Sequence, residues 1–176
     1  VDYTAVIDTS RGLEAYYAYD MGKAQTAIDA AMAELGAVKN DAGVWSFNDA
    51  PINVKFLIRN DGDGTRLSMG EYISQQMEAL GFQVERKLGK SSELSPDWIG
   101  SDPLAGTWNV YTGGWGSSGL NRDERTIFQE MYLPNSAQGI PLFTENVPDP
   151  LFQEVGDKLA NGVFDTLEER KDLIVE

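Results

Sequence analysis

Residues 51–88 read PINVKFLIRNDGDGTRLSMGEYISQQMEALGFQVERKL, and this stretch decides the fold class. It begins with an apolar run over residues 52–58 and a Gly- and Asp-rich loop, NDGDGT, a pattern typical of a buried strand that ends in a turn. Apolar side chains at helical spacing follow up to Gly81, and FQVERKL then predicts a second strand. Strand, helix and strand joined by short loops form a βαβ unit, so the two strands should be parallel neighbours in one sheet.

The segments before this unit predict a helix and a hairpin. Asp20 is a candidate N-cap and Gly36 a candidate stop for a helix whose apolar face comprises Ala24, Ala27, Ile28, Ala31 and Leu35. GVWSF and a turn at residues 48–50 predict a hairpin that leads into the buried strand. The helix expected inside the βαβ unit has six residues on one face, namely Met69, Tyr72, Ile73, Gln76, Met77 and Leu80.

The segments after the unit predict a third strand and more helices. SSELSPDWIG is typical of a short helix, and TWNVYTGGWG of a strand that opens into a glycine-rich loop. Helices are expected over residues 124–132 and 151–159, and Thr166 with Glu169 forms a capping box for a final helix. We therefore predict an α/β fold, an open mixed sheet flanked by helices, in a single domain over residues 1–176.

Composition excludes several classes of function. The chain has 14 Lys+Arg against 28 Asp+Glu, a net charge of −14 that repels nucleic acid. It has no Cys and no His, which removes thiolate nucleophiles, imidazole proton transfer and the usual zinc sites. The sequence contains no G-x-S-x-G and no S-x-x-K motif. We predict a protein that is not an enzyme and that carries no cofactor or metal.

Two glycine-rich loops need separate interpretation. GWGSSG, residues 114–119, matches the letters of the dinucleotide-binding motif, but no helix opens inside it and no acidic strand residue follows at the expected distance. NDGDGT suggests a calcium loop, yet with Gly64 at the sixth position Arg59 would be first and Gly70 would be twelfth, where a Glu is required. We interpret both loops as turns that follow strands, where ligands of open α/β sheets bind.

Taken in order, the segments resemble the extracytoplasmic solute-binding proteins of the peptide/nickel class, family 5, that serve ABC importers. The resemblance begins at YDMGKAQTAIDAAMAELG, similar to a Tyr-Asp-Pro-x-Lys-Ala helix of the family, with Met21 in place of the proline. It continues through GVWSFNDAPINVKFLIRN, MEALGFQVE, the Gly-Trp pair of WNVYTGGWG, and EERKDLI. The resemblance implies the second lobe of a periplasmic-binding-protein-like (type II) fold, excised from a two-lobed parent whose first lobe is absent here.

The resemblance also implies a function, a location and partners. Such proteins lie outside the cytoplasm, trap a solute between two lobes by hinge closure and deliver it to an ABC transporter permease. Peptide-binding members place an Asp a few residues beyond the Gly-Trp pair, where this chain has Ser118. An oligopeptide and an oligosaccharide therefore both stay open as the ligand. The implied ligand-binding residues are Arg59, Asn60, Asp61, Trp115, Gly116, Ser117, Ser118 and Asp123.

Two other functions stay open on the sequence. The excess of acidic residues fits a carboxylate-dependent glycoside hydrolase, which uses a pair of carboxyl groups. The NDGDGT loop fits a calcium-dependent interaction module, because carboxylate oxygens at alternate positions suit a hard cation.

Overall fold

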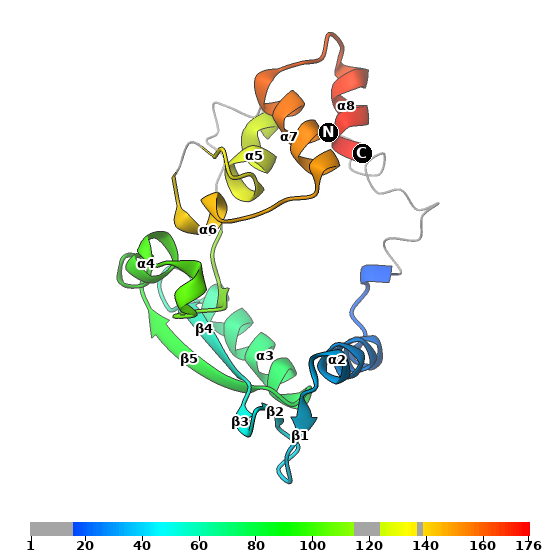
Figure 1. The fold of residues 1–176 in the computed structure, drawn as a ribbon. Helices are drawn as coiled ribbons and strands as arrows, with labels where there is room; N and C mark the ends of the chain where they lie inside the picture. The colour runs from blue at the N-terminus through cyan, green and yellow to red at the C-terminus, as the bar shows by residue number, and fades with distance from the viewer. Residues whose placement is uncertain (1–15, 115–123, 137–138) are drawn as a thin grey trace. The chain divides into compact units, whose positions relative to one another are not determined.

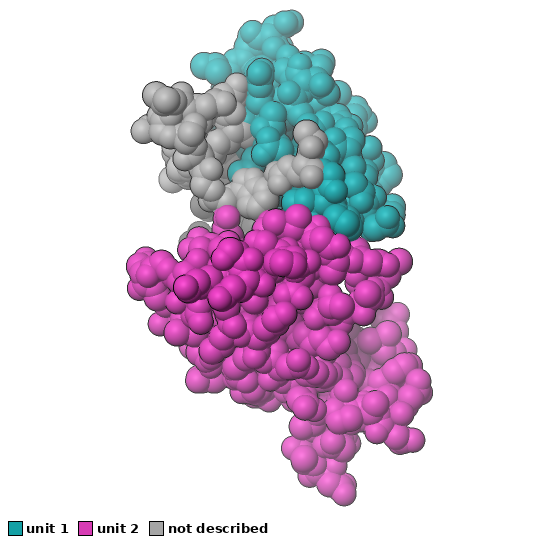
Figure 2. All heavy atoms as spheres, turned by 90° about the vertical axis from the view of Figure 1, so that its left-hand side faces the viewer, with its two compact units in different colours: residues 1–19, 115–176 teal, residues 20–114 magenta. Residues whose placement is uncertain are grey.

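The computed structural model describes residues 16–114, 124–136 and 139–176, and the chain divides into two compact units. One unit spans residues 20–114, which we call the sheet unit, and the other comprises residues 1–19 and 115–176, which we call the helical unit (Figure 2). The ligand-binding residues predicted in the segment 115–123 lie outside the described residues. The single domain expected over residues 1–176 stays a prediction.

A three-stranded parallel sheet forms the centre of the sheet unit, with strand order β5-β4-β6. Figure 1 shows β4 and β5 of this sheet. The strands are β4 (Asn53–Arg59), β5 (Gln83–Gly89) and β6 (Val110–Tyr111). β4 runs through the middle, and its residues Phe56, Leu57 and Ile58 are at most 1% exposed. The parallel βαβ unit and the third strand predicted from the sequence are therefore confirmed.

Helices cover both faces of this sheet. Successive residues of a strand point to opposite faces, so two neighbouring residues of β5 show which helix lies on each face. On one face, Arg86 of β5 bonds to Glu71 and Glu78 of α3 (Thr65–Ala79). On the other face, the next residue, Lys87, bonds to Asp97 of α4 (Ser91–Gly100) at 2.8 Å. The α/β class with helices flanking the sheet is confirmed.

The face of α3 that packs on the sheet agrees only in part with the predicted one. Met69 and Tyr72 are exposed, whereas Gly70 and Ser74 are buried. A Cβ on Gly70 would lie 2.5 Å from Ile58 Cγ2, so the helix approaches β4 where it has no side chain. The Ser74 hydroxyl donates to the Gly70 carbonyl at 2.8 Å, which satisfies its polar group inside the interface. Leu80 of the predicted face is buried and Ile73, Gln76 and Met77 are half-buried, so the apolar spacing predicted part of the packed face. It missed the contact at Gly70 because that contact depends on a small residue.

A second, antiparallel sheet stands apart from the parallel one, so the expected single mixed sheet is two sheets. Its strands are β1 (Val38–Lys39), β2 (Trp45–Phe47) and β3 (Ala50–Pro51). The predicted turn between β2 and β3 is present, with Asn48 and Asp49 at φ 50° and 63°. Trp45 of β2 donates its backbone N–H to Gly81 O and its indole N–H to Leu80 O, which ties this sheet to the end of α3.

The helix α2 (Met21–Leu35) begins and ends where the sequence predicts, since Asp20 Oδ1 accepts from the Gly22 and Lys23 N–H groups and Gly36 takes a left-handed conformation. It carries no buried residue, and Leu35 of its expected apolar face is exposed. The position of the helix along the chain is therefore confirmed, but the expected burial of its face is not seen.

The described part of the helical unit consists of short helices around a small apolar core. They are η4 (Glu124–Thr126), α5 (Ile127–Tyr132), α6 (Pro141–Thr144), α7 (Pro150–Asn161) and α8 (Leu167–Val175). Leu133, Ile140, Phe143, Val155 and Leu159 form the buried core. The predicted capping box of α8 is confirmed, because Thr166 and Glu169 bond to each other's backbone N–H groups.

Candidate ligand-binding edge of the parallel sheet

The carboxyl ends of β4, β5 and β6 meet at one edge of the parallel sheet, which we call the carboxyl edge. β4 ends at Arg59 beside Gly89 of β5, and the Asn60 N–H donates to the Gly89 carbonyl at 3.0 Å. On the other side, the Arg59 N–H donates to Thr112 Oγ1 at 2.8 Å and the Thr112 N–H donates to the Leu57 carbonyl at 3.0 Å. The loop after β4 is thus bonded to the chain that leaves β6, and the two begin side by side.

Arg59 and Asp61 form an ion pair within this edge. Arg59 Nε lies 2.8 Å from Asp61 Oδ1, and Arg59 Nη2 lies 2.9 Å from Asp61 Oδ2, so the pair is bidentate. Asp61 Oδ2 also accepts the Ser91 N–H at 3.2 Å, at the first residue of α4. The Asp61 carboxylate therefore joins the end of β4 to the start of α4.

The pKa values of this pair follow from its hydrogen bonds. The bonds from Arg59 and then from the Ser91 N–H hold the pKa of the Asp61 carboxyl well below its usual range. The bond to Asp61 raises the pKa of Arg59. Both groups stay charged at physiological pH, and the guanidinium edge made of Nε and Nη2 is already used inside the protein.

Asp63 and Arg66 stand at the start of α3, beside the same edge. Asp63 Oδ1 accepts the Thr65 N–H at 3.0 Å, and this bond lowers the pKa of the Asp63 carboxyl. Arg66, the second residue of α3, directs its guanidinium at Gly114, since a Cβ on Gly114 would lie 2.8 Å from Arg66 Nη2. Arg66 is not among the site residues predicted from the sequence, although it directly follows the loop that ends β4, and such loops are where ligands of α/β sheets bind.

The predicted site residues divide into two groups. Arg59, Asn60 and Asp61 lie at the carboxyl edge; Asn60 is exposed, and the other two are half-buried. The remaining five lie outside the described residues: Trp115, Gly116, Ser117, Ser118 and Asp123. Their ligand-binding role stays a prediction.

The tryptophans of the sheet unit have structural contacts. Trp45 is buried and bonds to the end of α3. Trp98 of α4 stacks on Tyr111 of β6, with ring centroids 5.3 Å apart. The Trp108 indole N–H donates to Ser101 Oγ at 3.3 Å. These three side chains therefore have contacts within the sheet unit.

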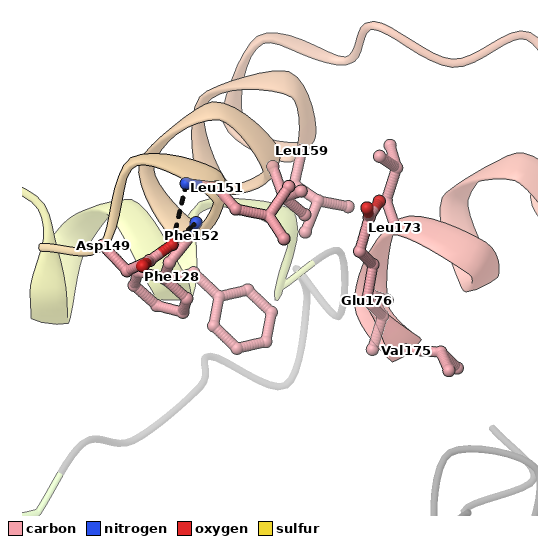
Figure 3. Close-up of a pocket in the computed structure, with 11 residues that line it drawn as sticks. Phe128, Asp149, Leu151, Phe152, Leu159, Leu173, Val175 and Glu176 are labelled. Carbon is pink, nitrogen blue, oxygen red and sulfur yellow. Dashed lines mark hydrogen bonds between the residues drawn. The ribbon is translucent and has the colours of Figure 1, made fainter.

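An apolar pocket of about 380 Å³ lies in the helical unit, between α7 and the end of α8 (Figure 3). Leu151, Phe152, Leu159 and Leu173 line it, and Asp149 at its mouth accepts hydrogen bonds from the first turn of α7. It contains none of the predicted ligand-binding residues.

The described residues contain neither a membrane-spanning helix nor a cluster of metal-binding side chains. No helix in the described ranges is both long enough and apolar enough to cross a membrane. Across the same part of the chain, no three His, Cys, Asp or Glu side chains gather in a way that could hold a metal ion.

Comparison with solved structures finds several binding proteins of similar fold. NikZ from Campylobacter jejuni, in complex with Ni(L-His), matches with a TM-score of 0.64 and 18% identity, over 90% of this chain and 29% of that one. MelB, a periplasmic binding protein from Agrobacterium fabrum in complex with stachyose, matches with a TM-score of 0.61 and 20% identity, over 91% and 24%. NikA from Brucella suis, in complex with Fe(III)-EDTA, matches with a TM-score of 0.51 and 15% identity, over 81% and 26%.

These similarities define the fold class: the chain has the fold of one lobe of a periplasmic-binding-protein-like (type II) structure. It spans less than a third of the length of each of these proteins. No protein-family model matches the chain, and no curated protein matches it in sequence.

Proposed function

We propose that the chain is one lobe of an extracytoplasmic solute-binding protein that serves an ABC importer. The observation that carries the proposal is the carboxyl edge, where Thr112 bonds the loop after β4 to the chain leaving β6. Ligands of open α/β sheets bind outside the carboxyl ends of the strands, so this edge is the wall that a solute would meet. The fold shared with NikZ and MelB supports the same class.

In this proposal the chain is the second lobe, and a first lobe of the same parent protein forms the opposite wall. The solute is held between the lobes by hinge closure, and the closed form docks on the permease. The solute is polar, an oligopeptide or an oligosaccharide. The contacts from this lobe are Arg59, Asn60, Asp61, Trp115, Gly116, Ser117, Ser118 and Asp123.

The carboxyl groups of the loop after β4 argue for binding rather than hydrolysis. A glycoside hydrolase needs one carboxylic acid whose pKa is raised, so that it can protonate the leaving group. The pKa values of Asp61 and Asp63 are instead lowered, because both carboxylates accept hydrogen bonds from neighbouring residues. Those bonds also use oxygens that a calcium ion would need in this loop.

The test is calorimetry on the full-length protein against two panels, one of oligopeptides and one of oligosaccharides that includes stachyose. We expect one panel to give saturable binding, and the 176-residue chain alone to bind much more weakly. The reason is that a site normally buries about 70–90% of its ligand, which one wall cannot do. Absence of binding to both panels, or turnover of a glycoside, would contradict the proposal.

A further inference from the structure

Two arginines stand at the carboxyl edge, and the structure treats them differently. Arg59 at the end of β4 is held by both oxygens of Asp61. Arg66 at the start of α3 is half-buried, yet its guanidinium has no hydrogen bond or ion pair with any described residue. Its charge reaches Asp63, whose pKa it helps to lower, but the Asp63 carboxylate is bonded to Thr65.

The guanidinium of Arg66 lies where the chain leaves β6. A Cβ on Gly114 would lie 2.8 Å from its Nη2, 3.7 Å from its Cζ and 3.8 Å from its Nε. The first distance is too short for a real Cβ, and the other two are ordinary van der Waals contacts. Gly114 thus leaves the space that the guanidinium occupies, and any side chain at this position would displace it.

We propose that Arg66 is the contact through which this lobe holds a carboxylate of its solute. The inference rests on the proposed function. A half-buried guanidinium has lost part of its hydration and gains most from an acceptor that uses several donors at once. A carboxylate is such an acceptor, since its two oxygens match two parallel N–H groups of arginine.

A carboxylate contact distinguishes the two candidate solutes, an oligopeptide and an oligosaccharide. An oligopeptide ends in a carboxylate, whereas a neutral oligosaccharide has none. Arg59 stays among the proposed contacts, but Asp61 already bonds to its Nε and Nη2, so Arg66 is the arginine of this edge whose donors are left for a carboxylate. The proposed solute therefore carries a carboxylate and is either a peptide or an acidic oligosaccharide.

The experiment compares probe pairs that differ in the carboxylate, on the full-length protein by calorimetry. The pairs are tetraalanine and its C-terminal amide, and trigalacturonic acid and maltotriose. We expect the carboxylate member of one pair to bind about 10- to 100-fold more tightly, the range for a hydrogen bond to a charged group. Arg66→Gln should abolish this preference and leave the affinity for the uncharged member within about 3-fold.

Two further variants separate the charge of Arg66 from its position. Arg66→Lys keeps the charge but loses the planar pair of donors, so part of the preference should remain. Gly114→Ala keeps the arginine but moves its guanidinium, and we expect the preference to fall about 3- to 10-fold, a partial loss of a charge-assisted bond. The matched controls are Lys87→Gln, which removes one exposed positive charge, and Gly100→Ala, whose Cβ would meet no atom within 4 Å.

The outcomes separate this inference from the proposed function. If the full-length protein binds both members of a pair equally, or if Arg66→Gln keeps the preference for the carboxylate, Arg66 is not the contact and solute capture stands. If none of the four probes binds, the inference is contradicted, whereas the proposed function is decided by the two panels described above. Thermal unfolding of each variant, followed by circular dichroism, shows whether a loss of binding is a loss of folding.

Discussion

The sheet unit and the helical unit differ in how the element at their centre is covered. β4 is enclosed between α3 and α4, and three consecutive residues, Phe56, Leu57 and Ile58, are at most 1% exposed. In the helical unit, α7 keeps an apolar pocket beside it, with Leu151 half-exposed at its wall. The loops that we propose to contact solute emerge from the rigid element, where small displacements of a site are least tolerated.

The largest expected effect on stability comes from truncating a buried side chain of β4. Phe56→Ala should lower the free energy of unfolding by about 3–5 kcal/mol, because it leaves a cavity that the two flanking helices cannot fill. Leu151→Ala in the helical unit should lower it by less than about 1 kcal/mol, because that side chain is 50% exposed. Urea unfolding of both variants measures the difference, and equal losses would contradict the burial of Phe56 between α3 and α4.

A pair of helical glycines gives a finer comparison of the two units. A Cβ on Gly70 would meet three atoms of Ile58, the nearest at 2.5 Å, and the branched side chain of Ile58 has little freedom to move. A Cβ on Gly156 would meet Leu133 Cδ1 at 2.9 Å and no other atom nearer than 3.7 Å. Both changes gain about 1 kcal/mol of helix propensity.

We therefore expect Gly70→Ala to destabilise the protein by about 1–3 kcal/mol, as overpacking does, whereas Gly156→Ala is close to neutral. Thermal and urea unfolding measure both variants. A neutral Gly70→Ala would mean that α3 does not approach β4 as closely as the structure shows.

The smallest effect expected is a dependence on pH. The pKa of Asp61 is lowered by folding, so its contribution to stability is complete above the pKa of an unfolded Asp, about 3.9. It is lost progressively as the pH falls below that value towards the folded pKa. The melting temperatures of the wild-type protein and of Asp61→Asn should therefore differ by a constant amount from pH 7 to about pH 5 and converge in acid.

The exposed pair of Glu154 and Lys158 in α7 is a control for this measurement. The pKa of Glu154 is also lowered by its partner, but the pair is surface-exposed, and such pairs contribute little. Glu154→Gln should change the pH profile less than Asp61→Asn. The opposite order would contradict the structural role given to Asp61.

The sequence predicted those features of the fold that depend on local patterns. Asp20, Gly36 and the capping box of Thr166 and Glu169 are local signals, and the structure has them at the predicted places. The parallel pairing of β4 and β5 followed from the connection rule for βαβ units. These rules need no knowledge of how side chains pack.

The features that the sequence did not predict depend on contacts between distant residues. The buried face of α3 is set by Gly70 against Ile58, and apolar spacing cannot detect a contact that works because a side chain is missing. The bidentate pairing of Arg59 with Asp61 was not predicted, because it depends on how the loop folds back. The ligand-binding role of Arg59 stays a prediction. Arg66 was missed because its neighbour at the edge, Gly114, is 48 positions away in the chain.

The join between α3 and β5 restricts how this chain can change in length. Trp45 bonds to the carbonyls of both Leu80 and Gly81, and a Cβ on Gly81 would lie 3.0 Å from Trp45 Cδ1. One residue inserted here would turn β5 over, so that Arg86 and Lys87 would exchange the acidic partners they have on opposite sides of the sheet. Homologues that differ in length should therefore carry their insertions elsewhere, for instance in the hairpin loops, and keep this junction at constant length.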